Sequence, residues 1–218
     1  MMTENFATAR HSMVLSQLRP NNVTSDSVAE AMDTIPREEF VPKNLRGVAY
    51  MDEDLEVANN RYLIEPRIFA LLIQAAKITK TDVVLDVACG TGYSSAVLGH
   101  LAQAVVALEE SEEMVAQATE TLTGLEADNV AVIEGSLVEG NAKQGPYNVI
   151  HINGAVDAAP ESLLNQLSED GRLVCVVGSN PGVAKIYSRQ GGGFYAKSLF
   201  NAAAPVNQSM KKSASFSL

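Results

Sequence analysis

The chain is poor in cysteine and has no long apolar run, and both shortages exclude classes of protein. Its only two cysteines, Cys89 and Cys175, form neither a disulfide framework nor a zinc-site spacing, so we expect no metal site and a reducing compartment, the cytoplasm. The longest nearly apolar run, residues 68–76, is too short to cross a bilayer, so no membrane partner is expected. Residues 1–15 carry polar and charged side chains throughout, unlike a signal peptide.

Basic residues are also scarce. Sixteen lysines and arginines stand against 26 acidic residues, which gives a formal net charge of −10. A general nucleic-acid binder draws its affinity from clustered basic side chains on phosphates, so no nucleic-acid partner is expected. Hydrophobic residues nevertheless make up 46% of the 218 residues, enough to exclude whole-chain disorder and to build the core of one ordinary domain.

The strongest positive signal is the stretch 82–93. Val83–Val87 is a mostly β-branched apolar run, typical of a strand buried on both faces. Gly90 and Gly92 interrupt it, and helical spacing begins at Tyr93. A strand, a glycine turn and a helix together cradle nucleotide-like ligands, because glycine permits close backbone approach and the helix start offers free N–H groups.

Two acidic residues near this turn favour one ligand. Asp86 precedes the turn, where a carboxylate would repel a pyrophosphate but suit a cation. Glu109 ends the next predicted strand, seventeen residues after Gly92, where a carboxylate can accept hydrogen bonds from both ribose hydroxyls. The third small residue of a dinucleotide loop is replaced by Ser95. This pattern favours S-adenosylmethionine, which carries an ammonium and a sulfonium, over NAD; a turn without a ligand is the alternative.

The amino-terminal part is predicted to be helical and then irregular. Apolar spacing predicts a helix over 3–18, and Ser27 with Glu30 reads as a capping box for a second short helix that Pro36 ends. The stretch 43–65 has no clear periodicity, and an irregular segment of that length is usually a functional loop or a lid.

From Pro66 onward, apolar runs and helical patterns alternate, which predicts a parallel sheet with helices on both faces. Two runs, 183–189 and 194–201, flank a glycine cluster and predict a hairpin. The strands before it are predicted at 83–87, 104–109, 130–134, 147–153 and 172–177, and the helices at 66–76, 93–102, 112–125 and 161–167. We expect a single domain with amino-terminal helices and a substrate-side loop (1–65), a Rossmann-like core (66–205) and a loosely held tail (206–218).

The segments 36–42, 84–93 and 170–178 carry a resemblance to a known family. Across residues 26–205 the chain resembles protein-L-isoaspartate O-methyltransferases. The segment 36–42, PREEFVP, resembles the family's amino-terminal signature, and 84–93 is similar to its cofactor motif, with Ala88 where a first glycine is usual. Segment 170–178 looks like the family's fifth strand. The resemblance implies a Rossmann-like α/β methyltransferase with a mostly parallel seven-stranded sheet, an antiparallel edge hairpin, S-adenosyl-L-methionine as cofactor, and a role in protein repair. The implied substrates are proteins or peptides with isoaspartyl residues, or another carboxylate acceptor.

The chain departs from this family at two motifs. The family's substrate motif, GQTISxP, falls on residues 60–66, NRYLIEP, so the serine associated with catalysis is Ile64 here. The family's Gly-Asp-Gly after the third strand falls on residues 135–137, so the aspartate expected to accept from the adenine amino group is Ser136. A hydroxyl can receive that bond, but more weakly than a carboxylate.

The acceptor-pocket candidates occupy the rewritten substrate motif: Arg61, Tyr62 and Ile64. An anionic acceptor needs donors, which Arg61 and Tyr62 can supply, with Asn59 and Asn60 as further candidates; ordinary solvated loop residues are the alternative. Methylation of an ionised carboxylate needs positioning and desolvation rather than a general base. The cofactor-binding candidates are Asp86, Ala88, Cys89, Gly90, Thr91, Gly92, Tyr93, Glu109, Glu110, Ser136, Leu137 and Asn153.

Other functions stay open on the sequence. The altered substrate motif also fits a methyltransferase of the same fold with a different acceptor, or a cofactor-binding protein without catalysis, and Ile64 is the position that separates them from a repair enzyme. An NAD-dependent oxidoreductase is disfavoured by Asp86 and Ser95. His151 is expected in the core, and Cys89 as a small residue in a tight turn.

Overall fold

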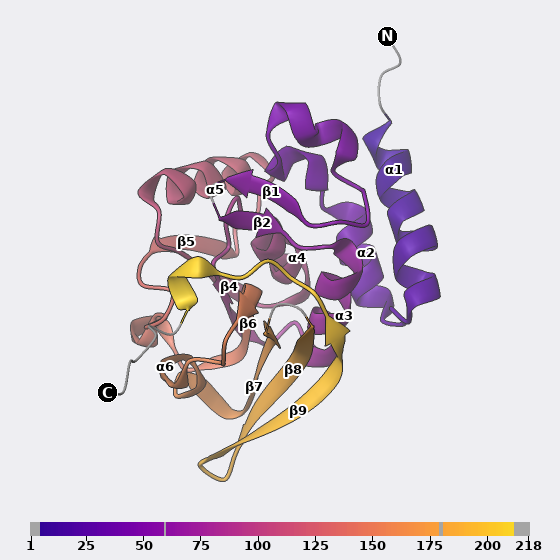
Figure 1. The fold of residues 1–218 in the computed structure, drawn as a ribbon. Coiled ribbons are helices and arrows are strands. Elements are labelled where there is room, and N and C mark those ends of the chain that lie inside the picture. Colours follow the sequence, from indigo (N-terminus) through magenta and orange to yellow (C-terminus); the bar gives the residue numbers. More distant parts are fainter. Residues whose placement is uncertain (1–4, 59, 179–180, 212–218) are drawn as a thin grey trace, which may run out of the picture.

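The computed structural model describes residues 5–58, 60–178 and 181–211. They form a seven-stranded sheet with the order β5-β4-β3-β6-β7-β8-β9 and a separate two-stranded sheet, β1-β2 (Figure 1). Strands β3 to β7 run parallel to one another, whereas β8 is antiparallel to β7 and β9 to β8 at one edge. This confirms the predicted fold class and the predicted edge hairpin.

The bounds of the elements follow the predicted alternation closely. The strands are β1 (Leu55–Ala58), β2 (Arg61–Leu63), β3 (Val83–Val87), β4 (Ala104–Glu109), β5 (Val130–Glu134), β6 (Tyr147–Val156), β7 (Leu167–Val177), β8 (Gly182–Gln190) and β9 (Gly193–Ala202). The α-helices are α1 (Phe6–Met13), α2 (Asp26–Thr34), α3 (Pro66–Ala76), α4 (Tyr93–Leu101), α5 (Glu112–Gly124) and α6 (Glu161–Leu164). No helix within the described residues is long and apolar enough to cross a bilayer.

Strand β3 lies between β4 and β6 in the interior of the sheet, and its side chains alternate between two apolar cores. Val84 belongs to the core under α2, α3 and α4, whereas Leu85 and Val87 belong to the core on the opposite face. Because successive side chains of a strand point to opposite faces, Asp86 lies on the face that α4 covers. The alternation therefore places a carboxylate beside the first turn of that helix.

The two faces of the sheet are covered unequally. Helices α3, α4 and α5 cover one face. The core of the other face includes Leu137 from a turn, Leu163 from the one-turn helix α6 and Met210 from a short 3₁₀ helix. The helix predicted over 161–167 is too long by three residues. The amide of Gln166 donates to the Glu139 carbonyl at 2.7 Å and fixes the chain in a turn, so strand β7 begins directly afterwards.

Two predictions for the amino-terminal part are wrong. Helix α2 is capped by Ser25 rather than Ser27, because the Ser25 hydroxyl accepts from the Val28 N–H at 3.4 Å. The stretch 43–65 is not irregular. It contains a 3₁₀ helix, Lys43–Val48, and the hairpin β1–β2, in which Leu55 pairs with Leu63 and both are buried. The predicted helix 3–18 is described from Phe6 onward, and residues 3–4, Asn59 and 212–218 of the predicted tail lie outside the described residues.

Candidate active site

The turn after β3 depends on backbone conformations that favour glycine. Gly92 has φ +95°, and an added Cβ would lie 3.0 Å from the Leu122 side chain on α5. Ala88, which takes the place of a usual glycine, also has a positive φ of 60°. This path brings the backbone N–H of Gly90 within 3.1 Å of the Glu109 carboxylate at the end of β4. The turn after β3 and the end of β4 thus meet at the Glu109 carboxylate.

Asp86 has a role that the sequence did not indicate. Its carboxylate is fully buried and accepts from the hydroxyls of Ser94 and Ser95, both at 2.6 Å, and from the Asn153 amide at 2.9 Å. The His151 ring nitrogen Nδ1 lies 2.8 Å from the same group. Asp86 lines neither cavity beside Glu109. The carboxylate therefore joins α4 to β6. Its role toward a cationic ligand stays a prediction.

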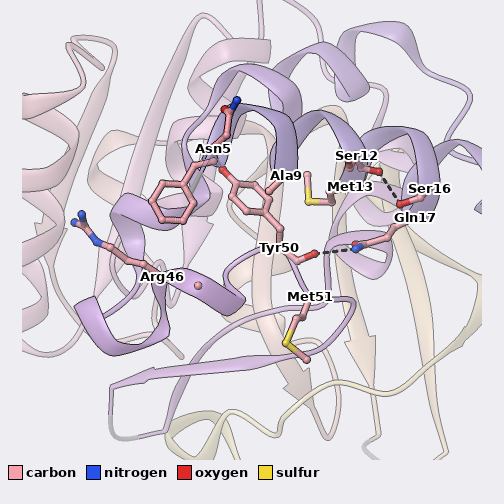
Figure 2. Close-up of a pocket in the computed structure, with 11 residues that line it drawn as sticks. Asn5, Ala9, Ser12, Met13, Ser16, Gln17, Arg46, Tyr50 and Met51 are labelled. Carbon is pink, nitrogen blue, oxygen red and sulfur yellow. Dashed lines mark hydrogen bonds between the residues drawn. The ribbon is translucent and has the colours of Figure 1, made fainter. Parts of the chain in front are cut away.

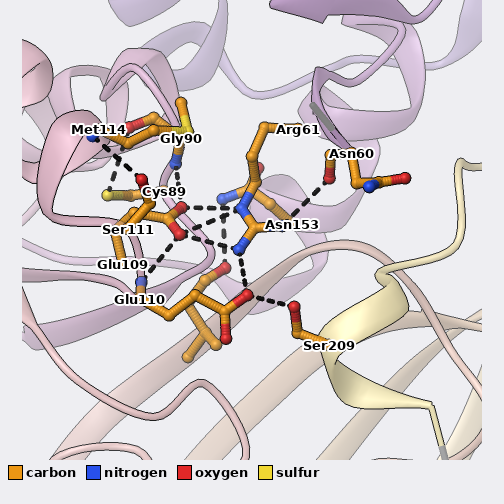
Figure 3. Close-up of polar contacts among 11 residues, drawn as sticks. Asn60, Arg61, Cys89, Gly90, Glu109, Glu110, Ser111, Met114, Asn153 and Ser209 are labelled. Carbon is orange, nitrogen blue, oxygen red and sulfur yellow. Dashed lines mark hydrogen bonds and ion pairs between the residues drawn. The ribbon is translucent and has the colours of Figure 1, made fainter. Parts of the chain in front are cut away.

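Glu109 is also fully buried, but its main partner is a cation from a different sheet. Arg61 of β2 forms a two-pronged ion pair with it, Nε to Oε2 at 2.9 Å and Nη2 to Oε1 at 2.8 Å (Figure 3). Nη2 also lies 2.8 Å from Glu110, and Nη1 donates to the Asn60 carbonyl at 3.1 Å. Burial acts to lower the pKa of Arg61, but the hydrogen bonds and charges of Glu109 and Glu110 outweigh it and raise that pKa. Arg61 is therefore a permanently charged partner of the predicted ribose-binding residue.

Two cavities meet at Arg61. An inner recess of about 10 Å³ lies beside Tyr62, Ala88 and Asn153, and an outer cavity of about 560 Å³ lies beside Glu110 and the start of α5. Arg61 lines both of them. Pockets for cofactor-sized ligands typically have volumes of 300–1,000 Å³. The outer cavity has that size, whereas the inner recess has room for about one water molecule.

The three acceptor candidates do not form one open pocket. Tyr62 lines the inner recess, and Arg61 is paired with Glu109. Ile64 is 3% exposed and belongs to the main core, and its place at the rim of an acceptor pocket stays a prediction. Its carbonyl accepts from Arg37 Nη2 at 2.9 Å, which holds the end of β2 down on the core. Asn60 lines both cavities.

Three further cofactor candidates are packed inside the protein. Thr91 is buried and donates to the Phe40 carbonyl at 2.7 Å. Tyr93 is buried between Phe40 and Phe69, at ring-centre distances of 5.6 and 6.0 Å. Burial raises the pKa of the Cys89 thiol well above its usual value, so the thiol stays protonated. These three residues fix the turn and the helix, and Cys89 fits the interpretation of a small residue in a tight turn.

The two candidates after β5 lie apart from the cavities at Arg61. Ser136 is exposed, and its hydroxyl accepts from the backbone N–H of Glu139 at 3.3 Å. Leu137 is 1% exposed in the second core. Neither residue lines the inner recess or the outer cavity. Their roles toward an adenine ring stay predictions.

Arg37 is a residue whose importance sequence reasoning missed, beyond its place in a motif. It is fully buried, donates from Nε to the Ala49 carbonyl at 2.8 Å, and lies 4.7 Å above the Tyr93 ring centre. Burial lowers the pKa of this guanidinium. No sequence signal distinguishes such an arginine from an exposed one, because its partners are backbone carbonyls far along the chain.

A further cavity of about 380 Å³ lies between α1 and the segment 46–51 (Figure 2). Arg46 is the only charged residue among those lining it, and Gln17 donates to the Tyr50 carbonyl there at 2.8 Å. It shares no lining residue with the two cavities at Arg61.

Within the described residues, no group of three or more His, Cys, Asp or Glu side chains could hold a metal ion. The candidate site is therefore the carboxyl end of β3, β4 and β6.

A seven-stranded sheet of this order, with a glycine turn after its first parallel strand and an acid ending the second, defines a Rossmann-like methyltransferase of the S-adenosylmethionine-dependent class. The model of the protein-L-isoaspartate(D-aspartate) O-methyltransferase family matches residues 9–204. The chain belongs to this family.

Individual relatives agree. The chain is 41% identical over 174 residues to a protein-L-isoaspartate O-methyltransferase of Koribacter versatilis, covering 80% of this chain and 78% of the relative. It is 38% identical over 179 residues to one of a Synechococcus species, covering 82% and 73%. A solved protein-L-isoaspartate O-methyltransferase superimposes with a TM-score of 0.80 at 25% identity, covering 93% of this chain and 67% of the other. A Plasmodium falciparum structure in complex with S-adenosyl-L-homocysteine shares the fold, with a TM-score of 0.78 at 18% identity and coverage of 92% and 98%.

Proposed function

We propose that this chain transfers the methyl group of S-adenosylmethionine to the carboxylate of isoaspartyl residues in damaged proteins or peptides. Family membership supports the reaction. The observation that carries the proposal is Glu109, a buried carboxylate beside the glycine turn that accepts from the Gly90 N–H. Its ion-pair partner, Arg61, lines a cavity of the size that a cofactor needs. The two free, buried cysteines also support a reducing compartment, which we propose is the cytoplasm.

The residues at this site fit the cofactor chemically. Glu109 is an acceptor without a proton to donate, which is what a pair of ribose hydroxyls requires. The Gly90 N–H holds one oxygen of that carboxylate in place, and Ala88 and Asn153 line the recess next to it. When bound, S-adenosylmethionine supplies a methyl group activated by a sulfonium.

The reaction does not require the protein to remove a proton from the acceptor. An isoaspartyl carboxylate is already ionised near neutral pH, so no general base is needed. The protein has to align the carboxylate with the methyl group and remove water from it. Tyr62 of β2 lies on the recess, and its hydroxyl is engaged by Glu56, its cross-strand neighbour on β1. The recess is therefore bordered by β2, the strand in which the family's substrate motif is replaced.

A second candidate is a methyltransferase with another acceptor, or a cofactor-binding protein without catalysis. The observation that favours it is Ile64, which replaces the family's serine and is buried with no hydroxyl to offer. All of these share the cofactor and differ in the acceptor or in whether a methyl group is transferred at all, so a methyl-transfer measurement separates them.

The test is transfer of a labelled methyl group from S-adenosylmethionine to an isoaspartyl peptide, beside the same peptide with a normal aspartyl residue. We expect methylation of the isoaspartyl peptide alone. The variant Glu109→Ala should lose this activity, whereas Glu112→Ala, on the first turn of α5, serves as the matched control and should keep it. Binding of S-adenosylhomocysteine without methylation of either peptide would contradict the proposed acceptor and favour the second candidate.

A further inference from the structure

The side chain of Arg61 occupies the position at which a cofactor's ribose would meet Glu109. Four N–H groups surround this carboxylate: Nε and Nη2 of Arg61 at 2.9 and 2.8 Å, the Gly90 N–H at 3.1 Å and the Glu110 N–H at 2.8 Å. A carboxylate has about four lone-pair sites, so ribose hydroxyls find no free acceptor here. The two backbone donors are fixed by the turn and by the strand end, so only Arg61 can leave.

We propose that Arg61 is an internal competitor of the cofactor: it holds Glu109 in the cofactor-free chain and must be displaced before S-adenosylmethionine binds. This inference rests on the proposed function of the site. It goes beyond that function because the affinity for the cofactor then depends on Arg61, a residue of the substrate segment that lies 48 positions before Glu109 in the sequence.

The cavities agree with the competition. Arg61 lines both the recess of about 10 Å³ beside Ala88 and Asn153 and the cavity of about 560 Å³ beside Glu110. Its guanidinium fills the space next to the Glu109 carboxylate, where ribose hydroxyls would have to bind.

The displacement is possible because of where Arg61 is anchored. Strand β2 has three residues and pairs only with β1, outside the main sheet, and two-stranded sheets are marginally stable on their own. Glu110, whose side chain is 38% exposed, already shares Nη2 of Arg61 at 2.8 Å. The guanidinium can therefore move from the buried carboxylate to the outer one and stay paired in both positions.

The freed arginine also changes the site for the acceptor. Once Glu109 is taken by the ribose, the charge of Arg61 is no longer neutralised by a buried partner. Arg61 is then paired only with Glu110 and has its Nε–H free for a second carboxylate, such as that of the acceptor. The competition thus favours binding of the cofactor before the acceptor.

The test is calorimetric titration of S-adenosylhomocysteine into wild type, Arg61→Ala and Arg67→Ala. Arg67, at the start of α3, pairs with Glu65 at 2.7 Å, lies outside both cavities and serves as the matched control. We expect Arg61→Ala to bind at least tenfold more tightly than wild type, and Arg67→Ala to bind as wild type does. The variant Arg61→Lys keeps the charge but not the two-pronged pair, so it should tighten binding by a smaller factor.

The outcomes are distinct. Equal or weaker binding by folded Arg61→Ala, with wild type still binding, overturns the competition and leaves the proposed function intact. Absence of binding by every protein overturns both. If Arg61→Ala does not fold, the wild type decides: the Nε–H NMR signal of Arg61, identified by its loss in Arg61→Lys, should lose its protection from water exchange when S-adenosylhomocysteine saturates the protein. Unchanged protection overturns the proposal.

Discussion

Asp86 and Glu109 are both buried carboxylates at the same end of the sheet, yet they are held in different ways. Asp86 is surrounded by two serine hydroxyls, an amide and an imidazole from α4 and β6 of the main fold. Glu109 accepts from the backbone N–H groups of Gly90 and Glu110. Its third partner is the guanidinium of Arg61, which belongs to the separate β1–β2 sheet. The difference teaches that burial alone does not identify a ligand site. Asp86 is part of the framework, whereas the partner of Glu109 is exchangeable.

The largest effect should be on stability. Asp86→Ala leaves several buried donors without an acceptor, so we expect it to lower the free energy of unfolding by about 3–5 kcal/mol. Glu109→Ala should cost less, about 1–2 kcal/mol, because Arg61 keeps Glu110 as a partner. Urea unfolding of the two variants measures both values. Equal losses would break the distinction between a framework carboxylate and an exchangeable one.

The second prediction isolates the ribose contact. In an Arg61→Ala background no competitor remains, so Glu109→Gln removes the charge and one of the two acceptor oxygens of the ribose partner. We expect the affinity for S-adenosylhomocysteine to fall about 10- to 100-fold, equivalent to about 1.4–2.8 kcal/mol. Glu110→Gln in the same background is the control and should change the affinity less than threefold. An effect of the control as large as that of Glu109→Gln would place the ribose at the outer carboxylate instead.

The third prediction concerns the acceptor side. Ile64→Ser restores the family's hydroxyl, and we expect kcat/KM for an isoaspartyl peptide to rise about three- to tenfold, with about 1–3 kcal/mol lost in stability because the hydroxyl enters a core position. Ile64→Val, which shortens the side chain without a hydroxyl, should not raise activity. An inactive wild type whose Ile64→Ser variant is also inactive, with cofactor binding intact, would count against the repair reaction.

The smallest effect is expected at the cysteines. Burial raises the pKa of Cys89 well above its ordinary value and that of Cys175 to about 12, so neither thiol ionises in the folded chain near pH 8. Because the thiolate is the reactive form, alkylation by iodoacetamide should be slow until pH approaches those values or the chain unfolds. Mass spectrometry after labelling with and without urea measures this. Fast labelling of Cys89 in the folded protein would show that the glycine turn opens.

The same comparison explains what could be predicted from the sequence. The strand, turn and helix around Gly92 follow from local patterns, and Glu109 follows from its spacing in the next strand, so both positions were found. The pair between Arg61 and Glu109 has no such signal, because its members lie 48 residues apart in segments that meet only in the folded chain.

The errors over the segment 43–65 and at Ser27 have a related cause. The segment containing Ile64 was predicted to be an irregular loop, and a residue in a loop is expected at a surface. In the structure, the buried side chains of Leu55 and Leu63 anchor a hairpin, and Ile64 follows into the core. Ser25 and Ser27 are both suitable caps by residue type, and only the backbone conformation at Ser25 decides between them.

Arg37 bears on whether the Rossmann-like part of the chain is autonomous. Its guanidinium touches Tyr93 at the start of α4 and donates to the carbonyls of Ala49 and Ile64, while Thr91 of the glycine turn donates to Phe40. A fragment that began at Pro66 would lose the Arg37 guanidinium and the Phe40 ring, which both contact Tyr93. It would also lose the Phe40 carbonyl, which accepts from the Thr91 hydroxyl. The amino-terminal residues are therefore a structural wall of the glycine turn rather than an appendage, and excision of the sheet would leave the cofactor's helix with a bare aromatic face.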